Sequence, residues 1–132
     1  MSETPIRHPG KVLVMDDDQM VLETARLILE RLGFDAVLAA DGKEAVALYH
    51  QQLGTDYPID VVILDLLVPG GMGAVEAATM ILEIDPDACL VVSSGAANDP
   101  VMIDCEAHGF RANMTKPYDV AGLGMLVGEL ID

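Results

Sequence analysis

Short apolar runs alternate along this sequence with longer segments in which apolar residues recur every three or four positions. The short runs are typical of strands buried on both faces, and the longer spacing is typical of helices with one buried face. The short runs predict five strands, at residues 11–15, 34–39, 61–64, 90–92 and 112–115. The longer segments predict a helix after each strand: at residues 19–32, from the Asp41-Gly42 turn onward, from Ala74 to about Asp85-Pro86, at 100–108 and at 118–131.

The strict alternation of strands and helices indicates the fold class. Parallel strands need a crossover between them, so the pattern predicts an α/β fold in which helices cover both faces of a parallel sheet. Five strand–helix units suit a doubly wound open sheet, since a closed eight-stranded barrel needs a far longer chain. Ligands of such sheets bind at the carboxyl ends of the strands. Functional side chains are therefore expected directly after the strands.

Polar residues follow four of the five predicted strands: Asp16-Asp17-Asp18 the first, Asp65 the third, Ser93-Ser94-Gly95 the fourth and Lys116-Pro117 the fifth. A single Asp after a strand is usually a helix cap or a turn residue, but here several carboxylates are expected at one edge. Two carboxylates about 4 Å apart repel by several kcal/mol at an effective dielectric of about 20. A bound cation would relieve that repulsion, and carboxylate oxygens favour Mg²⁺ or Mn²⁺ over Zn²⁺.

Composition narrows the classes of function. The chain has 132 residues, 52% of them hydrophobic, and a net charge of −15, which fits one globular domain with a strongly negative field. That field disfavours binding to nucleic acid or to an anionic membrane, and it favours cations and basic protein surfaces. No apolar run reaches the roughly 18–20 residues of a membrane helix, and Cys89 and Cys105 form no disulfide framework. With no signal peptide visible, we expect a cytoplasmic protein with a lead-in or linker at residues 1–10 and one domain at residues 11–132.

Over residues 11–131 the sequence resembles the receiver domains of two-component response regulators, such as the chemotaxis regulators. The resemblance rests on five short motifs in the right order, each next to a predicted strand end: residues 14–18, 63–65, 68–73, 93–95 and 116–117. The stretches 68–73, 98–102 and 109–110 are most similar to receivers attached to hybrid histidine kinases. This resemblance implies a flavodoxin-like (βα)5 fold with the strand order 2-1-3-4-5.

The resemblance also implies phosphoryl transfer. Asp65 matches the phosphoacceptor, whose carboxylate attacks the phosphohistidine of a histidine kinase or a phosphotransfer domain. Ser94 matches the hydroxyl that hydrogen-bonds to a phosphoryl oxygen, and Lys116 matches the ammonium that pairs with another. Pro117 is expected to hold the Lys116 loop in place, with a cis bond as one option and the commoner trans bond as the other. Such a domain catalyses only its own phosphorylation and dephosphorylation, so it is not expected to be an enzyme.

A Mg²⁺ or Mn²⁺ site follows from the same resemblance. Asp17, Asp65 and the backbone carbonyl of Leu67 match direct metal ligands, and Asp16 matches a ligand that acts through water. A shift of one residue would put Asp17 and Asp18 in the place of Asp16 and Asp17. We favour the first register, because it turns the apolar positions of the following helix toward the sheet and leaves Asp18 as the helix cap.

Several residues depart from the family pattern. Asn113 lies three positions before Lys116, where many receivers have an aromatic residue that swings inward after phosphorylation. Movement of the loop after the fourth strand is then expected to carry more of the switch. Tyr118 could substitute for that aromatic residue from nearby, but we favour its interpretation as a residue that packs at the cap of the last helix. Leu67 and Ala96 occupy positions that tune dephosphorylation in the family, and neither side chain can orient an attacking water.

Two other functions compete with this interpretation. A haloacid-dehalogenase-like phosphatase would use Asp16 as its nucleophile, with Ser94 and Lys116 in its second and third motifs. That reading leaves Asp65 without a role, lacks an acidic pair after Lys116 and leaves no room for a cap domain. The other competitor is a degenerate receiver that binds partners without being phosphorylated. It is disfavoured because none of the key residues is missing.

The expected partner is a histidine kinase or a phosphotransfer domain. In the family, kinases usually dock at the first helix, here residues 19–32, and output partners at the segment that corresponds to residues 99–130. A kinase or output domain in a longer chain is also compatible with the sequence. The domain by itself is expected to bind neither nucleic acid nor a membrane.

Overall fold

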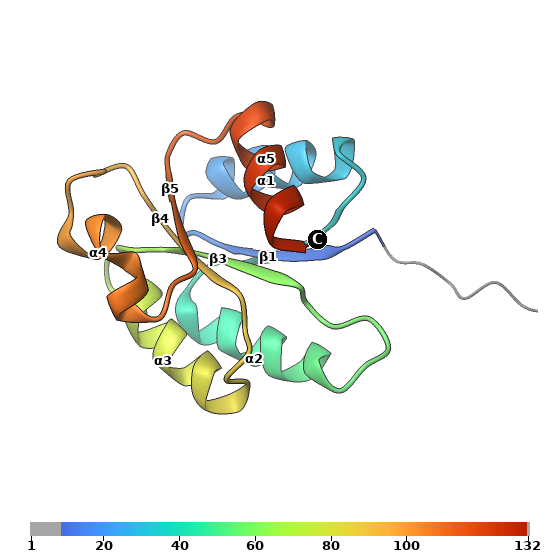
Figure 1. The fold of residues 1–132 in the computed structure, drawn as a ribbon, viewed down its shortest axis with the longest axis horizontal. Coiled ribbons are helices and arrows are strands. Elements are labelled where there is room, and N and C mark those ends of the chain that lie inside the picture. The colour runs from blue at the N-terminus through green and yellow to red at the C-terminus, as the bar shows by residue number, and fades with distance from the viewer. Residues whose placement is uncertain (1–8, 132) are drawn as a thin grey trace, which may run out of the picture.

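Five parallel strands form a single sheet in the order β2-β1-β3-β4-β5 (Figure 1), which confirms the order that the family resemblance implied. The computed structural model describes residues 9–131. The strands are β1 (Lys11–Met15), β2 (Asp35–Ala39), β3 (Val61–Asp65), β4 (Leu90–Ser94) and β5 (Ala112–Thr115). Every residue of β3 and β4 is buried, as expected for inner strands that are covered on both faces. β2 begins one residue later than predicted, and β3 and β4 extend into the polar residues that follow their apolar runs.

Helices cover the two faces of the sheet as separate layers (Figure 1). One layer holds α1 (Gln19–Arg31) and α5 (Val120–Ile131), and the other holds α2 (Gly42–Leu53), α3 (Ala74–Ile84), α4 (Pro100–Ile103) and the 3-10 helix η1 (Cys105–His108). Side chains of each strand alternate between two hydrophobic cores. Leu13 of β1 belongs to the core beneath α2 and α3, whereas Val12 and Val14 pack beneath α1 and α5. The predicted doubly wound α/β fold is therefore confirmed.

The helix predicted at residues 100–108 is interrupted, so this prediction was wrong. α4 ends at Ile103, Asp104 has a non-helical backbone with φ −122° and ψ 58°, and the chain continues as η1. The side-chain amide of Asn113 on β5 donates a hydrogen bond of 2.7 Å to the Met102 carbonyl. A continuous α-helix would use that carbonyl for its own bond from residue 106. A side chain from β5 thus satisfies the Met102 carbonyl of α4 in place of the next helical turn.

The last helix begins at Val120 and not at Tyr118, which corrects the predicted boundary. Tyr118 is buried in the core beneath α1 and α5, and the preceding Lys116–Pro117 peptide bond is cis. Asp119 caps the helix, because its side chain accepts a hydrogen bond of 2.6 Å from the Gly122 amide.

The glycine-rich loop between β3 and α3 is held close to the sheet edge. A Cβ atom on Gly73 would lie 2.6 Å from the carbonyl oxygen of Leu66, so only glycine permits this approach. The amide of Gly42, at the start of α2, donates a hydrogen bond of 2.8 Å to the Met72 carbonyl. A Cβ atom on Gly42 would lie 2.7 Å from the Met72 side chain. Both contacts fix the loop that directly follows Asp65.

The lead-in predicted at residues 1–10 lies outside the described residues up to His8. Gly10 is buried, and its carbonyl accepts a hydrogen bond of 2.9 Å from the Asp35 amide on β2. The packed part of the chain therefore includes Gly10, one residue before the predicted domain boundary. Among the helices of residues 9–131, none has both the length and the apolar character needed to cross a membrane.

Candidate functional site

Three aspartates converge at the carboxyl edge of the sheet. Met15 of β1 is paired with Leu64 of β3, so that Asp16 and Asp65, the next residue on each strand, come together. One carboxylate oxygen from each of Asp16, Asp17 and Asp65 lies within 4.8 Å of the other two. Asp16 and Asp65 are 0% and 4% exposed, whereas Asp17 is exposed. The cluster thus has two buried carboxylates and one that opens toward solvent.

Asp18 lies outside this cluster and begins α1. Its carboxylate accepts a hydrogen bond of 2.9 Å from the Met20 amide, as an N-cap residue does. Its own amide donates a bond of 2.9 Å to the carboxylate of Asp16. The structure therefore places Asp16 and Asp17, and not Asp18, beside Asp65.

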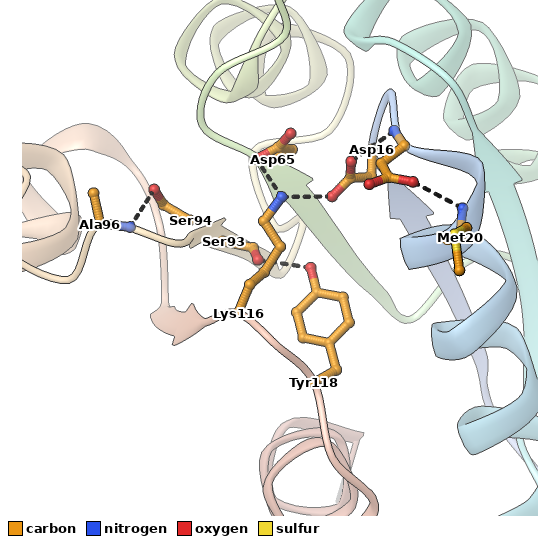
Figure 2. A network of polar contacts seen from close by, with 9 residues as sticks. Asp16, Met20, Asp65, Ser93, Ser94, Ala96, Lys116 and Tyr118 are labelled. Atoms are coloured by element: carbon orange, nitrogen blue, oxygen red, sulfur yellow. Dashed lines mark hydrogen bonds and ion pairs between the residues drawn. The ribbon is translucent and has the colours of Figure 1, made fainter.

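Lys116 brings a positive charge into the cluster from the segment after β5. Its Nζ lies 2.8 Å from Oδ2 of Asp16 and 3.2 Å from Oδ1 of Asp65, as Figure 2 shows. The backbone amide of Lys116 donates a bond of 2.9 Å to the Ser94 carbonyl, which extends the β4–β5 pairing up to the lysine. A single ammonium group thus bridges two buried carboxylates.

The charges of this cluster shift each other's protonation. Burial raises the pKa of Asp65 above its usual value, the Asp16 carboxylate raises it further, and Lys116 lowers it only in part. Burial lowers the pKa of Lys116, but the hydrogen bonds and charges of Asp16 and Asp65 outweigh it, so the net shift is upward. Lys116 therefore stays protonated, and the charge of Asp65 is costly unless further cations approach.

Ser94 is the last residue of β4 and lies beside Thr115 of β5 in the sheet register. Its hydroxyl accepts a hydrogen bond of 3.0 Å from the Ala96 amide, and Figure 2 shows it turned toward Ala96 and away from Lys116. An accepting hydroxyl keeps its own proton free for donation. The sheet thus brings Ser94 to the same edge as Asp65, although the two side chains are not bonded to each other here.

A second serine, Ser93, belongs to the same motif as Ser94, but the sequence analysis assigned it no role. Ser93 is paired with Asp65 in the β3–β4 register and is 0% exposed. Its Oγ lies 2.6 Å from the hydroxyl of Tyr118. Burial raises the pKa of Tyr118 to about 12, so this hydroxyl remains neutral. Tyr118 packs in the core beside the start of α5, as expected, and its hydroxyl also contacts β4; the alternation of faces along β4 indicates that Ser93 projects to this same core.

The residues that depart from the family pattern occupy different environments. Asn113 is bonded to the Met102 carbonyl, as described above, and so is tied to the end of α4. Leu67 is 68% exposed, and Ala96 is exposed as well. Neither Leu67 nor Ala96 therefore contributes a polar side chain to the site.

The donor atoms of the cluster fit a hard divalent cation. Carboxylate oxygens are the ligands that Mg²⁺ and Mn²⁺ prefer, and the exposed Asp17 leaves the cluster open to an ion with bound water. The cluster contains no sulfur or imidazole ligand that would favour Zn²⁺. The backbone carbonyl of Leu67, two residues after Asp65, stays a predicted ligand.

An apolar groove adjoins the cluster between α1 and the segment after β5. Its volume is about 340 Å³. It is lined by Met20, Val21, Thr24, Lys116, Pro117 and Tyr118. Met20 is 80% exposed at its rim. A partner that approached Asp65 from this side would contact the groove.

Residues 12–127 match the family model described as the response regulator receiver domain. The chain belongs to this family. The match includes all of Asp16, Asp17, Asp65, Ser94 and Lys116, and it supports the receiver over the phosphatase that was considered as a competitor. The protein is thus a receiver domain of two-component signalling.

Known receivers resemble this chain in fold and in sequence. The crystal structure of a CheX–CheY–BeF₃–Mg²⁺ complex from Borrelia burgdorferi matches with a TM-score of 0.84 and 28% identity, over 95% of this chain and 91% of that one. Chemotaxis protein CheY of Thermotoga maritima is 28% identical over 82% of this chain and 86% of its own length. Hybrid signal transduction histidine kinase I of Dictyostelium discoideum is 34% identical over 58% of this chain, but the match spans only 4% of that kinase. Receivers therefore occur among these relatives both as nearly whole proteins and as small parts of long chains.

Proposed function

We propose that this receiver domain accepts a phosphoryl group on Asp65 from the phosphohistidine of a histidine kinase or a phosphotransfer domain. The observation that carries the proposal is the placement of Lys116, whose Nζ lies 3.2 Å from Oδ1 of a buried Asp65 within a cluster of carboxylates. Asp16, Asp17, Asp65 and the carbonyl of Leu67 would hold Mg²⁺ or Mn²⁺ there. When bound, the ion supplies positive charge that offsets the charge of the phosphoryl oxygens.

The side chains of the site support each part of the transfer. An oxygen of the Asp65 carboxylate forms a bond to phosphorus while the bond from phosphorus to the imidazole nitrogen of the donor breaks, and the electron pair stays on that nitrogen. Lys116 is protonated and is placed to pair with a phosphoryl oxygen. The Ser94 hydroxyl has its proton free to donate to another oxygen. The acyl phosphate formed is labile, which suits a reversible signal.

The site alters its own carboxylate and is not proposed to turn over an external substrate. The apolar groove beside Asp65, between α1 and the segment after β5, supports docking of the phosphodonor at α1. The face of α4, β5 and α5 is proposed for output. A kinase or output domain in a longer chain, and a cytoplasmic location, are further proposals. The longer chain is supported by the relative in which the receiver is a small part. The cytoplasmic location is supported by the two cysteines, which form no disulfide with each other.

The decisive experiment is treatment with acetyl phosphate and Mg²⁺, followed by intact mass measurement. Wild type is expected to gain one phosphate, and Asp65→Asn none. Asp18→Asn is the matched control, because Asp18 lies in the same acidic triplet but outside the cluster, and it is expected to gain one phosphate. An adduct on Asp65→Asn would move the acceptor to another residue. No adduct on folded wild type would favour the degenerate receiver, and release of many equivalents of phosphate would favour a phosphatase.

A further inference from the structure

We infer that Ser93 and Tyr118 form a buried hydroxyl pair that positions Lys116 for the phosphoryl transfer, so that both act as positioning residues. The inference rests on the proposed function of Asp65, and it assigns roles to two residues to which the family resemblance gave none. Figure 2 shows the Tyr118 hydroxyl directed at Ser93, below the point where Lys116 reaches Asp65.

The sheet brings these side chains to one face. Val91 of β4 packs in the core beneath α1 and α5, so Ser93, two residues on, projects to the same face. Met114 of β5 packs in that core as well, and Lys116 is the next residue in the alternation. Tyr118 belongs to the same core. The hydroxyl pair and the ammonium group therefore share one side of the sheet, at its carboxyl edge.

The segment that carries Lys116 is held at two places on β4. The amide of Lys116 donates a bond of 2.9 Å to the Ser94 carbonyl, and the hydroxyl of Tyr118 lies 2.6 Å from Ser93 Oγ. Lys116 is thus attached through its own backbone, and the second attachment follows two residues later along the chain. Because Ser93 is the β4 residue paired with Asp65, the second attachment ties the lysine segment to the strand directly beside the acceptor. The distance between Nζ and Asp65 is then set by both strands together.

The polarity of the pair argues for a specific role. Ser93 is 0% and Tyr118 is 7% exposed, and Tyr118 packs among the apolar side chains beneath α1 and α5. Burying a hydroxyl costs free energy unless it finds a partner, and an alanine with a phenylalanine would fill these places without that requirement. The two hydroxyls can bond to each other only when the segment after β5 lies at one position along β4. The hydrogen bond therefore selects that position more sharply than non-directional apolar packing would.

The same protein contains a matched control far from the site. The hydroxyl of Tyr49 on α2 lies 2.6 Å from Asp85 after α3, and Tyr49 is buried in the opposite core. Tyr49→Phe and Tyr118→Phe remove the same group from hydrogen bonds of equal length. Any difference between them in phosphorylation then reports on location and not on the loss of a hydroxyl.

The first test compares rates of phosphorylation by acetyl phosphate in Mg²⁺ over a range of donor concentrations. Tyr118→Phe and Ser93→Ala are each expected to lower the maximal rate by about tenfold, less than the roughly hundredfold that a 1 Å misplacement can cost. The double variant is expected to be no slower than either single one, because the pair acts as a unit. Tyr49→Phe is expected to keep the wild-type rate. Wild-type rates in both site variants would overturn the inference.

The second test reads the lysine itself in metal-free, unphosphorylated protein. The chain has only three lysines, so the side-chain NMR signals of Lys116 can be assigned with a Lys116→Arg variant. Tyr118→Phe is expected to shift the Lys116 signals, and Tyr49→Phe to leave them in place. Unchanged signals in Tyr118→Phe would overturn the inference even if Asp65 is phosphorylated. Shifted signals would support it even if wild type accepts no phosphate, in which case only the proposed function fails.

Discussion

Asp65 is a buried carboxylate whose charge is not balanced by its neighbours in the unphosphorylated protein. It lies beside Asp16, with Oδ1 3.2 Å from the ammonium of Lys116. Lys116 also contacts Asp16 at 2.8 Å, so a single positive charge is divided between two buried negative ones. This imbalance suits the proposed role of Asp65, in which it receives both a cation and a phosphoryl group. It also means that the fold carries a cost at the site when neither is bound.

That cost predicts a pH-dependent stability difference between wild type and Asp65→Asn in chelator. Burial and then Asp16 raise the pKa of Asp65 above 3.8 in the folded state, so the folded protein binds this proton more readily than the unfolded chain. Ionisation therefore removes stability as the pH rises through the folded pKa, and below 3.8 that loss is absent. Asp65→Asn is expected to be more stable than wild type near pH 7 and to lose this advantage as the pH falls toward 4.

Urea unfolding at a series of pH values measures the difference. Asp56→Asn controls for the change of net charge, because Asp56 is an exposed carboxylate, and its difference from wild type is expected to vary little with pH. If wild type is the more stable protein at neutral pH, or if the difference for Asp65→Asn does not change with pH, the charge of Asp65 carries no cost in the folded state.

At the scale of single elements, the length of α4 is decided by a residue of β5. The amide of Asn113 holds the Met102 carbonyl, and the chain leaves the helix at Asp104. Asn113 occupies the position at which the family resemblance led us to expect an aromatic switch residue. In this protein the same position connects β5 to the end of α4 through a hydrogen bond.

Asn113→Ala is expected to lower the free energy of unfolding by about 1 kcal/mol, since it leaves the Met102 carbonyl without its donor. Asn113→Asp has nearly the same shape but no donor at neutral pH, and it is expected to destabilise more than alanine does because its carboxylate would face the carbonyl. Urea unfolding measures both. Asn98→Ala, at an exposed asparagine of the β4–α4 loop, is the control and is expected to change little. Equal stability of Asn113→Ala and wild type would show that the bond does not hold α4.

The elements differ in how far the sequence alone predicted them. β3 and β4 were predicted to within one or two residues, because strands covered on both faces must be apolar throughout. The start of α5 was placed two residues too early, although Asp119 caps this helix through a local hydrogen bond from the Gly122 amide. The break in α4 was missed because it depends on a tertiary contact that local periodicity does not contain, that of Asn113 with Met102. The same limit applies at the site.

The convergence of Asp16, Asp65 and Lys116 could be predicted from the sequence because parallel strands end at one edge. The contact of the single Lys116 ammonium with both carboxylates depends on side-chain geometry, so the sequence could not predict it. The family resemblance supplied the strand order, which neither periodicity nor composition contains. Tyr118 was expected to pack beside the start of the last helix and does so, but its contact with Ser93 depends on tertiary structure and could not be predicted from the local sequence.

The whole molecule carries 22 acidic and 7 basic residues, so any cation relieves some of its self-repulsion. A specific Mg²⁺ site must be distinguished from this general effect. Screening by salt acts on all exposed charges and depends on ionic strength alone. A bound ion acts on the three clustered aspartates and stabilises only the folded state, in which they come together. The two effects therefore respond differently to substitution within the cluster.

Mg²⁺ is expected to raise the midpoint of thermal unfolding of wild type relative to chelator at matched ionic strength. A ligand at about one hundred times its Kd adds roughly 2.7 kcal/mol, and each kcal/mol moves the midpoint of a domain of this size by roughly 2–8 °C. Asp17→Asn removes the exposed ligand of the cluster and is expected to abolish most of the rise in midpoint. Asp18→Asn keeps the helix cap and is expected to show the full rise. Because the two variants change the net charge equally, screening predicts the same response from both. Equal midpoints of wild type in Mg²⁺ and in chelator would mean that the three carboxylates are held together by the fold and Lys116 alone, without a metal site.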